Sequence, residues 1–360
     1  MQSHAMSHQM LIINPGSTST KVALFDGTKK LSEQVIRHEG EKLRRFENVA
    51  DQFEFRLEAI APWIESLDLA PAAVKAVVGI GAPLRPMEGG SYAINDRMLE
   101  ELQNRQWSNH ASNLGAVLAF YLGEQFSVPS MIVDPITTDD FTDLARVSGL
   151  KEIKRKCRSH ALNLKEVCRR QAARAGKKLE DVNFVAVHMG GGISVAALEG
   201  GRVVDVNDGL LGMGPFSPDR CGAVPIGGLV KLCYSGQFSE QEMLDRLSRH
   251  SGLMSYLGES DLRKVEQMIE DGDTRAELYF NAMAYQIAKE TGAVAVVLKG
   301  QYQAIVLTGG MAHSERLVDQ IAERVEFLGD IQVVPGEFEM EAMAAAGLRF
   351  LTGEENLKEY

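Results

Sequence analysis

The chain has 360 residues, of which 45% are hydrophobic and 24% charged, and this is the composition of a globular protein with two or three domains. Fibrous and disordered classes are therefore excluded. A net charge of −11, without any block of five basic residues, argues against nucleic acid as a partner, and no apolar run approaches the roughly 18 to 20 residues of a membrane span.

The N-terminal residues and the cysteines both indicate the cytoplasm. Residues 1–9 contain neither the basic nor the apolar region of a secretory signal. The four cysteines form no C-x-x-C pair and are too few for a disulfide scaffold in so long a chain. We therefore expect a cytoplasmic protein without a membrane partner.

The first half of the chain begins with two apolar runs around a polar, glycine-containing turn. Residues 10–14 and 21–26 are predicted to form the two strands of a hairpin. The pattern then predicts strands and amphipathic helices over residues 74–80, 96–105, 113–125 and 130–134.

The second half repeats this order and adds a third strand to the hairpin. Strands are predicted at 184–188, 195–199 and 202–206, and the turn glycines Gly16 and Gly190 lie about half a chain length apart. Strands and helices then alternate over residues 158–175 (helix), 239–299 (mostly helix, with 274–292 the longest periodic piece), 304–308 (strand), 314–325 (helix), 331–334 (strand) and 337–351 (helix). This order predicts an internally duplicated protein with two mixed α/β domains and no flexible linker.

The first hairpin tip has the composition of a phosphate site. The segment Asn14-Pro-Gly-Ser-Thr-Ser-Thr-Lys21 offers hydroxyl groups, a flexible glycine and an ammonium group. It differs from a Walker loop because the second glycine is absent and a strand follows it. The alternative is a polar hairpin tip with Lys21 on the surface.

Two glycine-rich turns are further candidates for binding a nucleotide. Gly190-Gly191-Gly192 leaves backbone N–H groups open to an anion, and His188 ends the preceding strand. Gly309-Gly310 lies between a strand and a helix, where amides bind sugars or phosphates. The alternatives are a buried structural histidine and a tight strand-to-helix turn.

Charged side chains at three places complete the candidate set. Asp134 ends an apolar strand, where α/β sheets present carboxylates, although Asp-Pro also starts turns. Arg220 lies in a proline-framed loop and suits developing negative charge, although surface arginines are common. Glu339 and Glu341 open the last helix, where they complement its dipole or bind Mg²⁺.

Taken together and in order, these segments resemble the butyrate kinases of the acetate kinase family, within the actin-like ATPase and sugar kinase superfamily. The resemblance covers residues 10–353 and is carried by Asn14–Lys21, His110-Ala-Ser-Asn-Leu-Gly-Ala116, Val133-Asp-Pro135, His160-Ala-Leu-Asn163, His188–Ser194, Gly214–Arg220, Ala284-Tyr-Gln-Ile-Ala-Lys289 and Leu307–Gly310.

The resemblance implies an α/β fold with two ribonuclease-H-like, actin-like domains facing a central nucleotide cleft. The N-terminal domain would comprise residues 1–136 and be completed by the C-terminal helix 345–360. Residues 137–344 would form the second domain, with the nucleotide site and the interface of a homodimer or higher homo-oligomer.

The resemblance also assigns roles to particular residues. ATP or ADP would be bound by Asn14, Ser17, Ser19 and Lys21, by the glycines Gly190, Gly191 and Gly192, and by Gly309 and Gly310. The catalytic group would be Arg220, Asp134, His160 and His188, with Mg²⁺, Arg220 and the two histidines neutralising charge. Glu339 would lie near Mg²⁺, with Glu341 as the alternative register.

The implied reaction is reversible transfer of the ATP γ-phosphoryl group to a short-chain carboxylate, butyrate or isobutyrate, as in fermentation. Acetate or propionate kinase is the alternative within this class, because one methylene is worth only about 1 to 3 kcal/mol. One position departs from the family. Ile80 replaces the arginine expected to bind the substrate carboxylate, with Arg85 following, and this favours a second alternative, a nucleotide-binding sensor or interaction protein of low activity.

Overall fold

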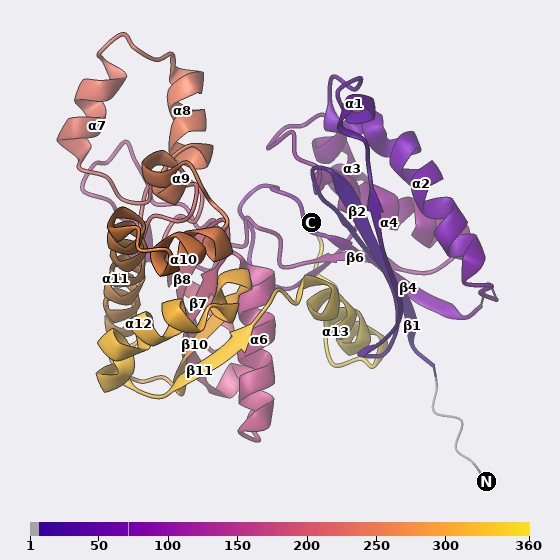
Figure 1. Ribbon diagram of the computed structural model, residues 1–360. Coiled ribbons are helices and arrows are strands. Elements are labelled where there is room, and N and C mark those ends of the chain that lie inside the picture. Colours follow the sequence, from indigo (N-terminus) through magenta and orange to yellow (C-terminus); the bar gives the residue numbers. More distant parts are fainter. Residues whose placement is uncertain (1–6, 71) are drawn as a thin grey trace. The chain divides into compact units, whose positions relative to one another are not determined.

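The computed structural model describes residues 7–70 and 72–360 (Figure 1). The chain divides into two compact units. Unit 1 runs to Thr138 and resumes with Phe338–Tyr360, and unit 2 is Asp139–Glu337. Within the described ranges, none of the helices has the length and apolar character needed to cross a membrane.

Unit 1 is built on a six-stranded sheet in the order β3-β2-β1-β4-β6-β5. The first three strands are antiparallel, β4 and β6 run parallel to β1, and β5 is antiparallel to β6 at the edge. Their bounds are β1 Gln9–Pro15, β2 Ser19–Asp26, β3 Lys29–Arg37, β4 Val74–Ile80, β5 Ser91–Ala93 and β6 Ser130–Val133.

Helices cover both faces of this sheet, which explains why β1 is apolar throughout rather than alternating. On one face, Leu11 and Ile13 join a core with α2 (Phe53–Ser66), α3 (Asp96–Gln103) and α4 (Asn113–Phe126). On the other face, α13 (Glu339–Leu351) packs against β1, β4 and β6. The short α1 (Gly40–Leu43) and the 3-10 turn η1 (Val49–Gln52) precede α2.

The sheet of unit 2 has the order β11-β10-β7-β8-β9. It again has three consecutive antiparallel strands followed by strands parallel to the first. Their bounds are β7 Asn183–Met189, β8 Ile193–Glu199, β9 Arg202–Val206, β10 Ala304–Gly309 and β11 Ile331–Pro335. The two sheets share this connectivity, so the predicted duplication is confirmed at the level of topology.

The helices of unit 2 also cover both faces of its sheet. The long helix α11 (Thr274–Val297) packs against β7 and β8, and α6 (Ala161–Arg174) packs against β7 and β10. The remaining elements are α5 Asp143–Arg146, η2 Leu179–Asp181, α7 Ile226–Cys233, α8 Glu240–Arg249, α9 Gly252–Leu257, α10 Leu262–Glu270, η3 Gly310–His313, α12 Glu315–Val325 and η4 Glu326–Leu328.

The predicted strands and helices all appear, and β3, α2 and α7 are among the elements that were not foreseen. Strand β3 is an exposed edge strand whose charged side chains hide its pattern. Helix α2 contains Pro62, and none of the residues of α7 is buried. The residues of β3 and α7 carry little of the core, whereas α2 contributes Ile60 and Trp63 to it.

The boundaries of the units differ from those expected from the sequence. The first falls after Thr138 instead of residue 136, and the chain returns to unit 1 at Phe338 instead of residue 345. The return comes early because α13 packs on the sheet of unit 1. At Gly347 a side chain would meet the Met10 sulfur at 2.6 Å, so this glycine permits the close approach.

Candidate active site

The hairpin tip between β1 and β2 holds the first group of candidate residues. Asn14 pairs with Lys21 and Pro15 with Thr20 across the two strands. The Gly16 N–H donates to the Ser19 carbonyl at 2.7 Å and closes the turn. Ser17 and Thr18 at the tip are exposed, so their hydroxyl groups face solvent.

Glu339, in the first turn of α13, lies beside this hairpin. The Asn14 side-chain amide donates to Glu339 Oε2 at 2.7 Å. Glu341 points elsewhere, where its carboxylate is 3.4 Å from the Lys30 ammonium. Of the two glutamates left open by the sequence, the geometry thus brings Glu339 to the candidate phosphate loop.

Asp134 lies at the carboxyl end of β6, buried and fixed to Gly90. Its backbone N–H donates to the Gly90 carbonyl at 3.0 Å, and its Oδ1 accepts the Gly90 N–H at 2.8 Å. The backbone has φ +35°, a left-handed conformation that is costly for a residue with a side chain. Such strained backbone clusters at functional sites, and here the two Gly90 bonds maintain it.

Ile80 and Asp134 belong to neighbouring strand ends. Ile80 pairs with Val133, the residue before Asp134. The Ile80 side chain packs on α4, because a Cβ added at Gly115 would meet Ile80 Cγ2 at 2.7 Å. Arg85 is engaged by the C-terminal segment, with its guanidinium carbon 4.2 Å from the centre of the Tyr360 ring. In this structure Arg85 is therefore held on Tyr360 and does not replace the arginine that is missing at position 80.

In unit 2, the three glycines form the turn between β7 and β8, and His188 lies near the end of β7. The Gly190 N–H donates to the Gly192 carbonyl at 3.0 Å. The Asn163 amide of α6 donates to His188 Nδ1 at 2.9 Å. Because an amide NH₂ only donates, Nδ1 accepts and the ring carries its proton on Nε2, close to Gly190.

His160 stacks on His188 with ring centres 3.9 Å apart, and His188 is buried while His160 is half-buried. Burial, together with the charge of Arg220, lowers the pKa of His160 to about 4. Burial and the neighbouring His160 lower the pKa of His188 well below its usual value. Both rings are therefore neutral at pH 7. Neutral rings of this kind offer N–H groups as hydrogen-bond donors.

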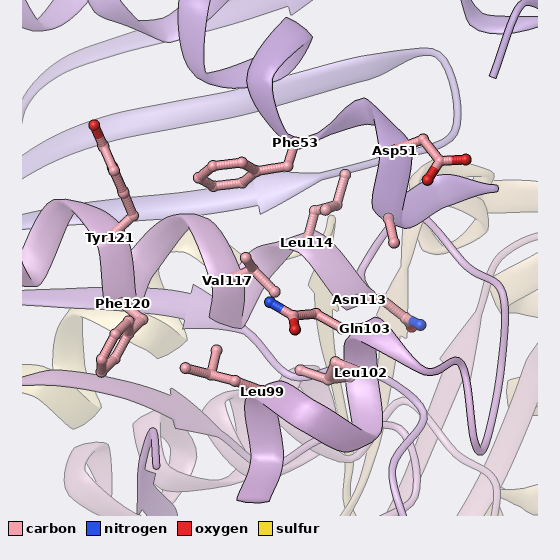
Figure 2. Close-up of a pocket in the computed structure, with 11 residues that line it drawn as sticks. Asp51, Phe53, Leu99, Leu102, Gln103, Asn113, Leu114, Val117, Phe120 and Tyr121 are labelled. Atoms are coloured by element: carbon pink, nitrogen blue, oxygen red, sulfur yellow. The ribbon is translucent and has the colours of Figure 1, made fainter. Parts of the chain in front are cut away.

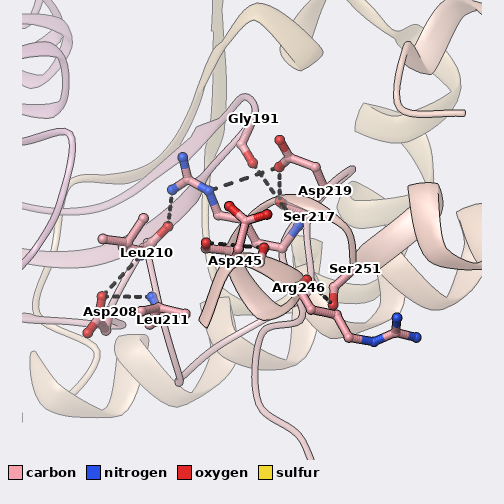
Figure 3. A network of polar contacts seen from close by, with 12 residues as sticks. Gly191, Asp208, Leu210, Leu211, Ser217, Asp219, Asp245, Arg246 and Ser251 are labelled. Atoms are coloured by element: carbon pink, nitrogen blue, oxygen red, sulfur yellow. Dashed lines mark hydrogen bonds and ion pairs between the residues drawn. The ribbon is translucent and has the colours of Figure 1, made fainter. Parts of the chain in front are cut away.

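The loop carrying Arg220 is attached to the glycine turn (Figure 3). Ser217 Oγ donates to the Gly191 carbonyl at 2.5 Å and accepts the Arg220 N–H at 3.1 Å. The Arg220 guanidinium donates to the Gly209 carbonyl and lies so close to Gly192 that a side chain there would collide with it.

The guanidinium of Arg220 is only partly satisfied. Its buried Nε–H has no hydrogen-bond acceptor among the residues that the structure describes, and Asp219 Oδ1 is 4.0 Å from this nitrogen. Burial lowers the pKa of Arg220, although Asp219 and Asp208 oppose this effect. A buried donor without an acceptor is costly, so an anion at this point would stabilise the loop.

Gly309 and Gly310 lie at the same sheet edge as His188. Thr308 pairs with His188, and Gly309 (φ +91°) passes so close to Met189 that no side chain fits. The turn η3 separates Gly310 from α12, and Ser314 caps that helix through the Leu317 N–H at 3.0 Å. Gly309 ends β10 and Gly310 begins η3, so the two glycines lie between the strand and the helix, as the sequence predicted.

An apolar pocket of about 400 Å³ lies elsewhere in unit 1, between η1, α3 and α4 (Figure 2). Phe53, Leu99, Val117 and Tyr121 are among its walls. None of the site residues predicted from the sequence lines it.

The structure thus makes two groups of the predicted residues. Unit 1 contains the hairpin tip, Asp134 and Glu339, and unit 2 contains the remaining ones. Two contacting residues were missed. Asn163 follows His160 by three residues and so shares its helix face, a signal available in the sequence. Glu337 Oε1 is 3.9 Å from His188 Nε2, and no pattern indicated it.

Two duplicated α/β units of this connectivity, each with candidate phosphate-binding turns, define the actin-like two-domain fold of the acetate kinases. The chain belongs to the acetokinase family, whose model matches residues 149–347, more than half of the chain. The family is one of phosphotransferases that act on carboxylates.

Solved structures agree with this fold. An acetate kinase from Porphyromonas gingivalis is 19% identical, with a TM-score of 0.78 over 96% of this chain and 100% of that one. A propionate kinase from Francisella tularensis is 18% identical, with a TM-score of 0.76 over 94% and 98%. An acetate kinase from Entamoeba histolytica is 16% identical, with a TM-score of 0.74 over 97% and 99%.

Proposed function

We propose that this protein transfers the γ-phosphoryl group of ATP reversibly to a short-chain carboxylic acid, with butyrate or isobutyrate preferred to acetate. The observation that carries the reaction type is the Arg220 loop, in which a buried guanidinium with an unsatisfied Nε–H is attached to the glycine turn. The preference for longer acids is supported by the resemblance of the sequence motifs to butyrate kinases.

Each unit contains turns that are candidates for binding the nucleotide. In unit 1, the phosphates would contact Asn14, Ser17, Ser19 and Lys21. In unit 2, they would contact the turn Gly190–Gly192, with adenosine against Gly309 and Gly310. Backbone N–H groups in glycine turns are suited to this because no side chain blocks an anion.

The described residues contain no cluster of three or more side chains that could hold a metal ion by themselves. Mg²⁺ still fits the site, because it does not need such a cluster. This ion commonly binds through one or two carboxylates plus substrate phosphates. Glu339, held by Asn14, would supply such an oxygen. Asp134 would position the Mg²⁺ ion or a neighbouring arginine. The bound ion would neutralise phosphate charge.

For this reaction the residues of the chain need to position the substrates, and no general base is required. An ionised carboxylate is already a nucleophile, so in-line alignment and charge stabilisation suffice. Arg220 would stabilise charge on the transferring group. His188 and His160, neutral in the structure, would donate hydrogen bonds, and Asp134 would not take a proton.

The proposal is tested by trapping acyl phosphate with hydroxylamine, using acetate, propionate, butyrate and isobutyrate. We expect a higher kcat/KM for the four-carbon acids. Equal or better kcat/KM with acetate would overturn the chain-length preference and favour an acetate or propionate kinase. Light scattering on the purified protein tests the homodimer, or higher homo-oligomer, that the resemblance also implies, and fractionation tests the cytoplasmic location.

A second candidate is a nucleotide-binding relative of low activity that acts as a sensor or interaction protein. It is favoured by Ile80, which packs on Gly115, and by Arg85, which lies on Tyr360. Nucleotide binding without acyl phosphate formation from any of the four acids would select this candidate.

A further inference from the structure

Arg56 of α2 is a fully buried arginine in contact with the candidate phosphate loop. It has no exposed surface. Its Nη1 donates to the Ser19 carbonyl at 3.1 Å and to Thr20 Oγ1 at 3.0 Å, and its Nη2 donates to the Ser17 carbonyl at 3.5 Å. Gln52 Oε1 accepts from Nε at 3.1 Å and from Nη2 at 2.9 Å.

Among the described residues, no carboxylate neutralises the positive charge of Arg56. Every acceptor just named is a neutral oxygen, and none of the described carboxylates forms an ion pair with this guanidinium. Burial lowers the pKa of Arg56 to about 10, which leaves it charged at pH 7. Fully buried charges are normally paired, because an uncompensated charge in a protein interior is costly.

The contacts of Arg56 also fix the direction of the loop peptides. The Ser17 carbonyl points toward Arg56, and the Thr18 carbonyl accepts the His38 N–H at 2.8 Å. In a trans peptide the C=O and the following N–H point in opposite directions. The N–H group of Thr18 therefore points away from the buried arginine, and the Ser17 and Thr18 side chains beside it are exposed.

We propose that Arg56 is a positioning residue that supplies the countercharge for a phosphate group bound on the outer side of the 16–19 tip. The inference rests on the proposed function, because it takes the bound anion to be a nucleotide phosphate. The loop presents the Thr18 amide and the Ser17 and Thr18 hydroxyls on the side away from Arg56, while one full positive charge contacts the Ser17 and Ser19 carbonyls. An anion on the outer side completes the pair that the chain leaves open.

A purely structural role differs in a measurable way. If Arg56 only holds the loop by hydrogen bonds, every substitution weakens anion binding alike, whether or not the charge is kept. If the charge matters, Arg56→Lys retains most of the affinity and Arg56→Gln, which still donates hydrogen bonds, does not.

The experiment measures the Kd of MgATP and of inorganic tripolyphosphate by calorimetry, together with the Tm with and without each ligand. We expect Arg56→Gln to raise both Kd values about 10- to 100-fold and to reduce the Tm gain on binding. Arg56→Lys should stay within about threefold of the original chain.

Arg155→Gln is the matched control, because this arginine is also largely buried but pairs with Asp205 at 2.6 Å. It should lower the Tm of the free protein and leave both Kd values unchanged. Unchanged Kd values in Arg56→Gln, or equal losses in the Gln and Lys variants, would overturn the inference. If Arg56→Gln does not fold, the Lys variant decides: more than a tenfold loss of affinity in a folded Arg56→Lys protein contradicts the role of charge.

The experiment distinguishes a failure of the role proposed for Arg56 from a failure of the proposed kinase reaction. A chain that binds tripolyphosphate in an Arg56-dependent way but makes no acyl phosphate supports the inference and contradicts the proposed reaction. A chain that makes acyl phosphate with Kd values independent of Arg56 supports the proposed reaction and contradicts the inference about Arg56. Failure of the original chain to bind either ligand contradicts both.

Discussion

Arg220 is the single side chain whose removal should most affect the chemical step. Its guanidinium contacts the glycine turn and has a buried N–H without an acceptor in the described chain. We expect Arg220→Ala to lower kcat about 10²- to 10³-fold with little change in ATP affinity, the scale for losing one preorganised charge-stabilising donor. Steady-state kinetics and calorimetry check this, with the exposed Arg202→Ala as control. A kcat within threefold of the original would show that Arg220 does not face the reacting group.

At Ile80 the chain should gain activity on substitution. Arg85 is held on the Tyr360 ring, so it does not replace the missing arginine. We expect Ile80→Arg to raise kcat/KM for the acid by about 10- to 10³-fold, or about 1.4 to 4 kcal/mol. Arg85→Ala should leave turnover nearly unchanged and lose about 0.5 to 1 kcal/mol of stability from the cation–π contact. An inactive Arg85→Ala beside an unimproved Ile80→Arg would reverse this assignment.

His38 should make unit 1 sensitive to acid. Burial, aided by the charge of Arg56, lowers the pKa of His38 to about 4 from the ordinary 6.5. The unfolded chain therefore takes up the proton first as the pH falls, and stability is lost between about pH 6.5 and 4. In His38→Gln the free energy of unfolding should fall less between pH 7 and 4.5, by roughly 2 to 3 kcal/mol. Urea denaturation at both pH values measures this, and parallel losses in the two proteins would contradict it.

At the scale of elements, the approach of α4 to β4 depends on glycine. A Cβ at Gly115 would lie 2.5 Å from the Ile80 carbonyl oxygen, so backbone would have to move. We expect Gly115→Ala to destabilise the protein by about 1 to 3 kcal/mol, despite the better helix propensity of alanine, and to displace the end of β4. Gly228→Ala in α7, where a Cβ meets nothing within 4 Å, is the control and should be neutral or stabilising. Equal unfolding free energies for the two variants would show that the contact is not tight.

The C-terminal segment is a second element that supports the site. Lys358 pairs with Tyr92 beside β5, and the Tyr360 hydroxyl donates to Glu101 at 2.5 Å. The Ser91 N–H donates to Glu355, next to the Gly90 that holds Asp134. The segment therefore braces the loop that fixes the Asp134 backbone in its strained conformation.

At the scale of the whole molecule, the two units differ in how the chain builds them. Unit 2 is continuous, with its own core around α11, whereas unit 1 needs two separate stretches. We expect the fragment 139–337 to unfold cooperatively by itself, and the fragment 1–138 to do so only when 338–360 is joined to it. Circular dichroism melts of the three polypeptides check this. Cooperative folding of 1–138 alone would show that α13 is dispensable.

Local patterns of the sequence predicted most strands, the glycine turns, the hairpin tip and the duplication. This was possible because apolar periodicity and turn residues determine local structure over short stretches of chain. Family membership followed from the same motifs. Partners and ionisation states depended on the tertiary structure. Asn14 meets Glu339 across 325 residues of sequence, which no local pattern reveals.

The remaining properties of the site, its ionisation states and side-chain positions, depend on burial. The neutral state of His160 and His188 and the buried, unpaired charge of Arg56 follow from the removal of water by segments remote in the sequence. The position of Arg85 on Tyr360 likewise depends on where the end of the described chain lies. Desolvation and long-range pairing depend on which surfaces meet, and only the folded chain decides that.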